Sequence, residues 1–363
     1  MPKDKQKFWL NLLTGIGLLA AAALIAYYII AGSGSAPAVP PPDDTVAVAP
    51  AAAPPVEETQ TVPLDTVAVH SDKMGRDIKN LVVVPAQYLD KSQPAACYPV
   101  LVLLHGADGS YVDWSQRVDL KQIATRHGVI IVCPDADDSW YFDSPVNPRS
   151  QYETYLSQEL IHYIDCHYRT YRSPCMRAIT GLSMGGHGAL WTALRHPDVY
   201  WSCGSMSGGV NIVSVPDRFG LDKVLGKFAQ NKELWQSHSV LSLVPTLKPG
   251  QNIIIDDGDR DFFYNDNLAL HQALLKQGIP HNFSIRPGRH AWKYWVESLG
   301  LHLKFFDEAF AQGRKVMNGG KPDQRAVLAT VKQTVRLRDT TAEAAPAKAT
   351  TKTTNQPTDT IQK

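Results

Sequence analysis

The sequence predicts an α/β protein in which a mostly parallel central sheet is covered by helices on both faces. Between residues 64 and 312, short apolar runs rich in β-branched residues alternate with stretches of helical hydrophobic spacing, the pattern of repeated strand–helix units. The runs are apolar throughout, as expected for strands buried on both faces. We therefore expect one folded domain over residues 64–312.

Six apolar runs are the predicted strands of this sheet. The clearest is Val100–Leu104, five aliphatic residues that end at His105-Gly106, where a turn should close a buried central strand. The other predicted strands are residues 81–84, 129–132, 178–180, 253–255 and 283–285, and the helices predicted between and after them are residues 156–164, 188–194, 268–275 and 292–310.

The beginning of the chain predicts a membrane anchor. Three lysines within the first seven residues precede an uncharged, mainly apolar stretch from Phe8 to Ala31, long enough as a helix to cross a hydrocarbon core of roughly 30 Å. Residues 1–31 are therefore predicted to form one N-terminal transmembrane helix, with the following domain in the periplasmic or extracellular space. A cleaved signal peptide ending near Ser35–Ala38 is the alternative, but the apolar stretch exceeds the usual length of about 7–15 residues.

Two segments of biased composition flank the predicted domain. Residues 32–63 are rich in Pro and Ala and predict an extended linker. Residues 313–363 are poor in aromatic side chains and rich in Thr, Lys and Ala, which predicts a disordered tail. Only residues 324–335 carry a weak helical pattern within that tail.

Charge and cysteine content restrict the partners and cofactors. The 36 basic and 35 acidic residues give a net charge of +1, which offers no electrostatic basis for binding nucleic acid. No metal-ligand spacing and no nucleotide-binding loop is apparent, so we expect no cofactor and no metal. Five cysteines leave at least one unpaired, and Cys166 with Cys175 is the one disulfide that we hypothesise, since export would permit it.

The strongest motif is Gly181-Leu182-Ser183-Met184-Gly185, which follows a predicted strand and precedes a predicted helix. This context is required of a nucleophile elbow, in which a strained serine sits on a tight turn between glycines. We therefore predict Ser183 as a catalytic nucleophile. A glycine-rich structural turn is the alternative, and the strand–helix context argues against it.

A serine hydroxyl needs a base and a properly oriented third group. His290 lies in a loop between the last predicted strand and the last predicted helix, at the edge of the sheet where Ser183 is expected. The acid should come from the segment after residues 253–255, where Asp256, Asp257, Asp259 and Asp261 compete. Asp256 lies nearest the strand and is expected to hold the turn through backbone N–H groups.

The oxyanion of a tetrahedral intermediate needs N–H donors. Met184 N–H follows the nucleophile, and a second donor is expected from the loop after Val100–Leu104, with Ala107 preferred and Gly106 as the alternative. Flat aromatic side chains suit an acyl or sugar pocket, so Trp140, Tyr141 and Trp292 are predicted to bind substrate. Trp295 is expected in the core, since it keeps helical spacing with Leu299.

Together these motifs resemble the esterase D family of serine esterases. The likeness covers about residues 77–310 and includes His105-Gly106, the Ser183 elbow, Gly258-x-x-Asp261-Phe262 and Gly288-Arg289-His290-Ala291-Trp292. The family includes S-formylglutathione hydrolases, tributyrin-type acetyl esterases, feruloyl and acetyl-xylan esterases, and mycolyltransferase relatives. The resemblance implies an α/β-hydrolase fold and favours Asp261 over Asp259 as the acid, with Phe262 packed under the loop.

The predicted function is therefore that of a serine carboxylic-ester hydrolase acting through an acyl-enzyme on short-chain, carbohydrate or aromatic esters outside the cytoplasm. An acyltransferase of the mycolyltransferase type, in which an alcohol replaces water, is the alternative within enzymes. A non-catalytic anchored binding module is the alternative from another class. The predicted export argues against a glutathione thioester, whose pool is chiefly cytosolic.

Overall fold

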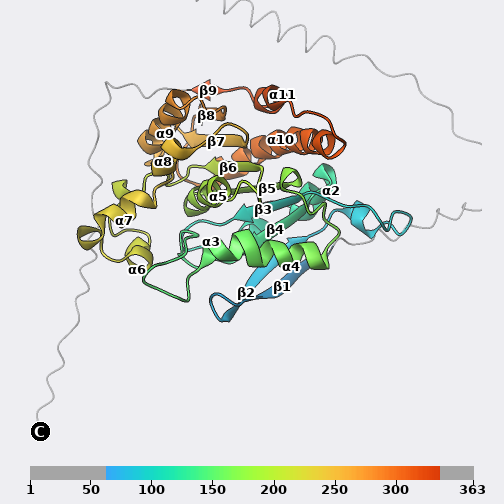
Figure 1. Cartoon of the computed structure of the whole chain (residues 1–363), viewed down its shortest axis with the longest axis horizontal. Coiled ribbons are helices and arrows are strands. Elements are labelled where there is room, and N and C mark those ends of the chain that lie inside the picture. The colour runs from blue at the N-terminus through green and yellow to red at the C-terminus, as the bar shows by residue number, and fades with distance from the viewer. Residues whose placement is uncertain (1–62, 336–363) are drawn as a thin grey trace, which may run out of the picture. The chain divides into compact units, whose positions relative to one another are not determined.

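A nine-stranded sheet forms the centre of the part of the chain that the computed structural model describes, residues 63–335 (Figure 1). The predicted transmembrane helix, nearly all of the predicted linker and residues 336–363 lie outside that range. No helix within residues 63–335 is both long enough and apolar enough to cross a membrane.

The sheet has the strand order β1-β2-β4-β3-β5-β6-β7-β8-β9, from the bottom to the top of Figure 1. The two pairings that involve β2, with β1 and with β4, are antiparallel, and every other pairing is parallel. The strands are β1 Leu64–Ser71, β2 Arg76–Val83, β3 Val100–Leu104, β4 Ile130–Pro134, β5 Arg177–Leu182, β6 Ser202–Met206, β7 Asn252–Gly258, β8 Asn282–Arg286 and β9 Thr334–Val335.

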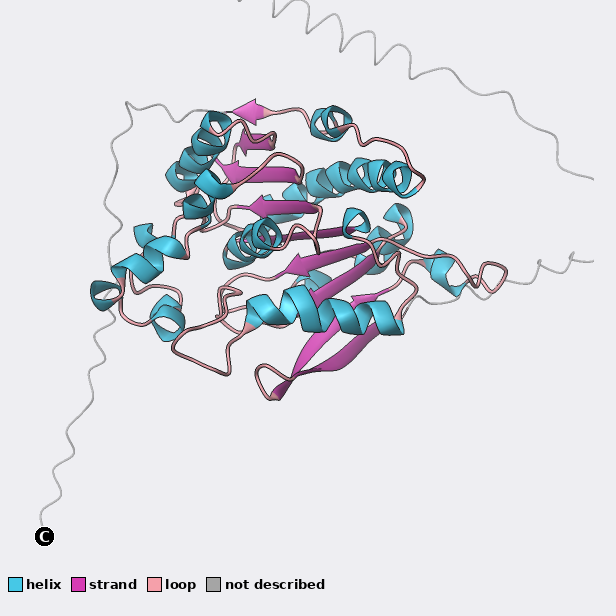
Figure 2. Cartoon of the chain, in the orientation of Figure 1, coloured by secondary structure: helices cyan, strands magenta, loops and turns pink. Residues whose placement is uncertain are grey.

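Helices cover both faces of this sheet (Figure 2). One core cluster includes side chains of α4, α5 and α9, and the other includes side chains of α2, α10 and α11. Strand β3 contributes side chains to both clusters, because alternate residues point to opposite faces of the sheet. Val100, Val102 and Leu104 belong to the first cluster, and Leu101 and Leu103 belong to the second. The helices are α2 Leu120–His127, α3 Tyr152–Thr154, α4 Leu160–His167, α5 Met184–Arg195, α6 Leu221–Leu225, α7 Lys232–Ser237, α8 Val240–Leu243, α9 Tyr264–Lys276, α10 Trp292–Met317 and α11 Gln324–Ala329, and a π-helical turn, Tyr155–Glu159, joins α3 to α4.

All six predicted strands are present, and β3 has the predicted bounds. Strand β6 was missed because its sequence, Ser-Cys-Gly-Ser-Met, contains no apolar run, although all five residues are buried between β5 and β7. Small side chains are needed there: a Cβ on Gly204 would lie 2.5 Å from the His302 ring. The residues of β6 are therefore restricted by the small space available to their side chains, and they show no hydrophobic pattern.

The domain boundary predicted at residue 312 is wrong, because it falls inside α10. That helix ends at Met317, and α11 and β9 extend the fold to Val335. Asn282 on β8 donates hydrogen bonds to the carbonyl oxygens of Leu328 and Val331, and Val327 is fully buried. The segment after α10 has few buried apolar residues and thus no clear hydrophobic periodicity, which is why the sequence predicted a disordered tail there.

The hypothesised disulfide is also wrong, since all five cysteines are free. Cys166 is exposed near His162, whereas Cys175 is buried with its Sγ 3.6 Å from the Gly313 carbonyl oxygen.

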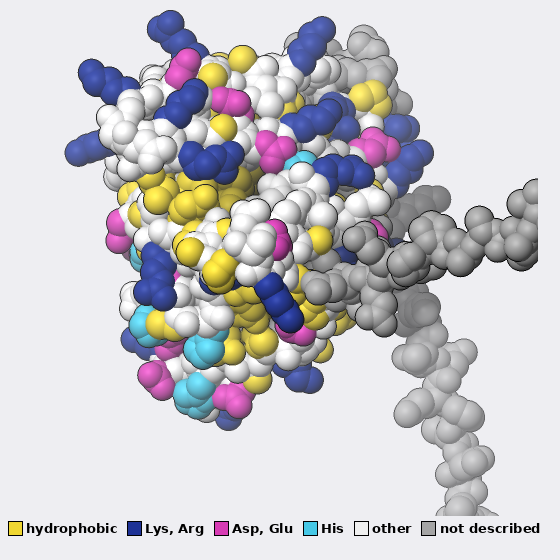
Figure 3. All heavy atoms as spheres, turned by 90° about the vertical axis from the view of Figure 1, so that its right-hand side faces the viewer, with side chains coloured by type: hydrophobic (Ala, Val, Ile, Leu, Met, Phe, Trp, Pro, Cys, Tyr) yellow, Lys and Arg dark blue, Asp and Glu magenta, His cyan; other side chains and the backbone are white. Residues whose placement is uncertain are grey.

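Both signs of charge are spread over the face shown in Figure 3, with hydrophobic side chains between them.

Candidate active site

Ser183 lies between the end of β5 and the start of α5, in the predicted elbow. Its backbone has φ 54° and ψ −116°, a strained conformation for a residue other than glycine. Neighbouring glycines permit the close approach that the turn requires: a Cβ on Gly185 would lie 2.4 Å from the carbonyl oxygen of His105, and one on Gly181 would lie 2.7 Å from the Gly185 backbone. The motif is therefore required by close packing around the serine.

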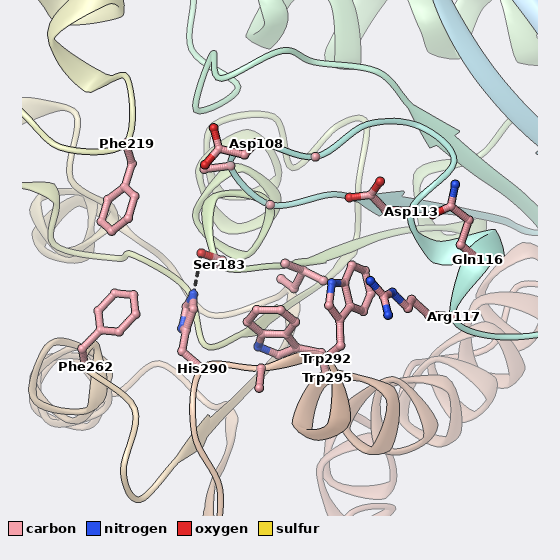
Figure 4. A pocket seen from close by; sticks show the side chains of 15 residues that line it. Asp108, Asp113, Gln116, Arg117, Ser183, Phe219, Phe262, His290, Trp292 and Trp295 are labelled. Atoms are coloured by element: carbon pink, nitrogen blue, oxygen red, sulfur yellow. Dashed lines mark hydrogen bonds between the residues drawn. The ribbon is translucent and has the colours of Figure 1, made fainter. Parts of the chain in front are cut away.

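Ser183, His290 and Asp261 form one continuous chain of hydrogen bonds. The Ser183 hydroxyl donates to His290 Nε2 at 2.8 Å (Figure 4). The opposite ring nitrogen, Nδ1, lies 2.8 and 3.0 Å from the two carboxylate oxygens of Asp261. A carboxylate only accepts, so Nδ1 carries the proton and Nε2 is free to receive the serine's proton. The fold thus brings together the three residues predicted as the catalytic triad.

Asp261 is fully buried, whereas His290 keeps 16% of its side chain exposed. The Phe263 N–H donates to Asp261 Oδ1 at 2.9 Å and helps to hold the carboxylate. Burial, followed by the negative charge of Asp261, raises the pKa of neighbouring Asp257 well above its ordinary value.

The other candidate acids have different partners. Asp259 accepts a hydrogen bond from the Gly288 N–H at 3.0 Å. The expectation that Asp256 holds a turn through backbone N–H groups is wrong: its carboxylate lies 2.7 Å from Arg286 Nη2 and accepts from the Tyr294 hydroxyl. Asp256 sits inside the sheet on β7, opposite β8, so it faces a side chain of the next strand.

The loop after β3 fixes the peptide that carries the predicted oxyanion donor. Ala136 N–H donates to His105 Nε2 at 3.0 Å, so Nδ1 is the protonated nitrogen and donates to the Gly106 carbonyl oxygen at 2.7 Å. Gly109 N–H donates to the same oxygen. In a trans peptide the C=O and the following N–H point in opposite directions, so Ala107 N–H points away from the His105 ring.

Ala107 borders the same cavity as Ser183, and Met184 is the first residue of α5, where backbone N–H groups have no partner within the helix. These are the two preferred donors of the sequence prediction. The alternative, Gly106, contributes its carbonyl oxygen to the turn. A side chain at position 109 is disfavoured, since a Cβ there would lie 2.9 Å from the Gly106 backbone oxygen.

A cavity of about 630 Å³ opens over Ser183. Figure 4 shows two sides: Phe219 and Phe262 lie on one side of Ser183, and Trp292, Trp295 and Arg117 lie on the other. The Phe219 and Phe262 rings are nearly parallel with centroids 6.1 Å apart, and the Arg117 guanidinium lies 5.0 Å from the centre of the Trp292 ring. An ester bound across Ser183 would contact aromatic surface on both sides.

Trp292 lines this cavity as predicted, whereas the predictions for Trp140 and Tyr141 are wrong. Both are fully buried, because their polar atoms bond inside the fold: Trp140 Nε1 donates to the Phe219 carbonyl oxygen and Tyr141 OH donates to that of His105. Trp295 is buried as expected but also borders the cavity.

Phe262 does not pack under the loop, since 52% of it is exposed and its ring lies against His290 at 4.2 Å. Phe219 and Arg117 were not predicted to line the cavity. Neither lies next to a recognisable motif, and only the fold places them there.

Within residues 63–335 no group of three or more His, Cys, Asp or Glu side chains is arranged to hold a metal ion.

Residues 71–306 match the model of the Esterase family, described as "Putative esterase". The match spans well over half of the chain. The protein belongs to this esterase family. Together with the hydrogen-bonded Ser183, this makes it a serine esterase of the α/β-hydrolase fold.

Individual relatives agree with this assignment. The S-formylglutathione hydrolase of Rattus norvegicus is 27% identical over 246 residues, which cover 60% of this chain and 86% of the relative. A solved ferulic acid esterase is 28% identical with a TM-score of 0.59, covering 68% of this chain and 98% of that one. Fluorophosphonate-binding serine hydrolase F of Staphylococcus aureus has a TM-score of 0.60 at 21% identity, covering 68% and 98%, and shares the fold.

Proposed function

We propose that the enzyme hydrolyses carboxylic esters through an acyl-enzyme formed on Ser183. The observation that carries this proposal is the unbroken hydrogen-bond chain from Ser183 Oγ through the His290 ring to Asp261, at the base of an open cavity. A serine in this setting can lose its proton to Nε2 as it attacks a carbonyl carbon, while Asp261 stabilises the imidazolium that forms.

The remaining steps follow from the same groups. The tetrahedral oxyanion is stabilised by Met184 N–H and Ala107 N–H. His290 returns the proton to the alcohol oxygen as the C–O bond breaks, leaving Ser183 acylated. Water then adds to the acyl carbonyl as His290 takes its proton, and collapse of the second intermediate releases the acid and the free serine.

The substrates that we propose are short-chain, carbohydrate or aromatic esters. The aromatic surfaces on both sides of Ser183 support this, since flat rings bind aromatic acyl groups and sugar faces well. The ferulic acid esterase relative points in the same direction. The S-formylglutathione hydrolase relative makes glutathione thioesters the competing substrate class.

A substrate panel tests this part of the proposal. The panel contains p-nitrophenyl acetate, methyl ferulate, acetylated xylose and S-formylglutathione, with kcat/KM measured for each. We expect the highest value for an oxygen ester. A preference for S-formylglutathione by a factor of about 100 or more, equivalent to about 2.7 kcal/mol in transition-state binding, would contradict it.

We further propose that the catalytic domain lies outside the cytoplasm, tethered by residues 1–31. The three lysines before the apolar stretch Phe8–Ala31 support this orientation. Fractionation tests it directly: the full-length protein should sediment with membranes and be digested by a protease added from the outer side. A protein recovered in the cytoplasmic fraction would contradict the proposal.

A further inference from the structure

The turn that follows β4, from Ala136 to Tyr141, is packed next to the active site but does not line its cavity. Three of its residues have positive φ: Asp137 at 45°, Trp140 at 55° and Tyr141 at 62°. Large side chains rarely adopt this conformation, and such strain persists only where surrounding contacts impose it. The contacts of this turn therefore indicate what the strain achieves.

Tyr141 binds the first residue of the loop after β3. Its hydroxyl donates to the His105 carbonyl oxygen at 3.0 Å, and its side chain is fully buried. The ring packs against the α5 backbone at Gly188, where a Cβ would lie 2.3 Å from a ring carbon. Tyr141 thus links the elbow helix to the loop that carries Ala107.

Asp138 binds the same loop on the other side of Ala107. Its Oδ1 accepts a hydrogen bond from the Asp108 N–H at 2.7 Å, a short, charge-assisted contact. Asp108 itself has φ 58°. Together with the Ala136 N–H bond to His105 Nε2, the turn makes three hydrogen bonds to the two residues that flank Gly106-Ala107.

We propose that Tyr141 and Asp138 are positioning residues that aim the Ala107 N–H at the oxyanion. This inference rests on the proposed function, because it assigns a role to the donor used there. Anchoring His105 and Asp108 fixes the ends of a short loop, so the peptide between them cannot rotate freely. Donors aligned in advance stabilise an oxyanion without reorganisation, and loss of one donor costs about 10²–10³ in kcat.

The same turn also holds one wall of the cavity. Trp140 Nε1 donates to the Phe219 carbonyl oxygen at 2.9 Å, and the Trp140 side chain is buried. Phe219 lines the cavity opposite Trp292 in Figure 4. A single buried turn therefore organises both the oxyanion loop and part of the substrate-binding surface.

Tyr141→Phe tests the proposal, with Tyr200→Phe as its matched control. Tyr200 is also fully buried and donates to a backbone carbonyl, that of Leu156, at 2.8 Å, but it precedes β6 at the opposite end of the strands from Ser183. Both variants lose one buried hydroxyl bond and a similar amount of stability. Only Tyr141→Phe should lower kcat on p-nitrophenyl acetate, by about 10- to 100-fold, with little change in KM.

A trifluoromethyl ketone inhibitor separates an oxyanion effect from a general loss of structure. Its adduct with Ser183 carries an oxyanion, so its Ki should rise in Tyr141→Phe by a factor similar to the loss in kcat/KM. The Ki of Tyr200→Phe should match the wild type. Equal kcat and Ki in the two Phe variants would overturn the role of Tyr141.

Asp138 provides an independent measurement if Tyr141→Phe does not fold. Asp138→Asn keeps an oxygen acceptor for the Asp108 N–H, whereas Asp138→Ala removes it, so the Asn variant should recover most of the kcat that the Ala variant loses. Wild-type kcat in Asp138→Ala, alongside an inactive Ser183→Ala, would reject the positioning proposal alone. Full activity in Ser183→Ala would instead reject the proposed function.

Discussion

Asp256 lies on β7 and Asp261 lies three residues after that strand ends. Both are fully buried and each pairs with a basic side chain on or after β8, yet they do different things. Asp256 pairs with Arg286, whose charge is permanent, and also accepts from Tyr294. Asp261 pairs with His290, an imidazole whose other nitrogen is free to accept a proton from Ser183. The difference shows that the partner, more than the burial of the carboxylate, decides whether an aspartate stabilises the fold or serves chemistry.

The surroundings of the two basic partners also differ, although both are little exposed, Arg286 at 19% and His290 at 16%. Arg286 is held between Asp256 and Ser298 Oγ and extends toward α10. Burial raises the pKa of Asp256, while the Arg286 charge opposes that rise. His290 instead borders the open cavity, with its second nitrogen bonded to Ser183. The Asp256–Arg286 pair therefore holds β7, β8 and α10 together, whereas the Asp261–His290 pair leads to the reactive hydroxyl of Ser183.

The largest effect should come from Asp261→Asn. Without the carboxylate, His290 adopts the tautomer that cannot accept the serine's proton, so kcat should fall by up to about 10⁴. The melting temperature should change little, because Asn nearly preserves the side-chain volume. Steady-state kinetics beside thermal unfolding measures both.

Asp259→Asn is the control for that variant. Asp259 lies two residues away and accepts from the Gly288 N–H, a bond that the Asn oxygen can also accept. Its kcat should stay far closer to the wild type. A large loss in Asp259→Asn with near-normal kcat in Asp261→Asn would reverse the assignment of the acid.

Asp256→Asn should show the opposite balance. Removing one charge of a buried pair leaves Arg286 with the more distant, exposed carboxylate of Glu297, so the free energy of unfolding should fall by about 3 kcal/mol. The loss of kcat should be much smaller than in Asp261→Asn, since Asp256 does not contact His290. Urea denaturation with activity assays under native conditions tests this, and a catalytic loss as large as that of Asp261→Asn would remove the distinction between the two aspartates.

A smaller effect should appear in the pH dependence of stability. Burial lowers the pKa of His302, and likewise of His187, to about 3. The folded state therefore binds fewer protons than the unfolded state between pH 6.5 and about pH 3, so stability falls as the pH drops through that window. Each such histidine should remove about 2 kcal/mol between pH 8 and pH 5.

His302→Asn should reduce this loss by the contribution of one histidine. His302 contacts the Thr180 hydroxyl of β5 and neither residue lines the cavity, so its replacement should leave the pH profile of catalysis unchanged. Urea denaturation at pH 8 and pH 5 gives the comparison. An unchanged pH slope in the variant would show that His302 does not remain neutral in the folded state.

The sequence alone was sufficient to predict Ser183 and His290, because each lies in a motif or loop whose residues have few other structural explanations. The Ser183 elbow requires glycines for steric reasons, and the loop containing His290 lies between a strand and a helix with clear hydrophobic periods. The six predicted strands followed from continuous apolar runs, whereas β6, which has none, did not. The choice of Asp261 depended on family resemblance, because four aspartates share one segment.

The aromatic residues show where sequence reasoning failed. Trp140, Tyr141 and Trp292 have side chains that suit either a pocket or a core, and their neighbours in the sequence do not distinguish these. Trp140 and Tyr141 are buried because each finds a backbone carbonyl partner far along the chain, at Phe219 and His105. Such partners become apparent only once the chain is folded.

The account depends most directly on Ser183 being the nucleophile. The measurement is labelling of the full-length protein with a fluorophosphonate, followed by digestion and peptide mass spectrometry, with Ser183→Ala in parallel. We predict one adduct on the peptide containing Ser183, loss of esterase activity in proportion to labelling, and neither labelling nor activity in Ser183→Ala. An adduct on a different serine, or wild-type activity in Ser183→Ala, would contradict the account.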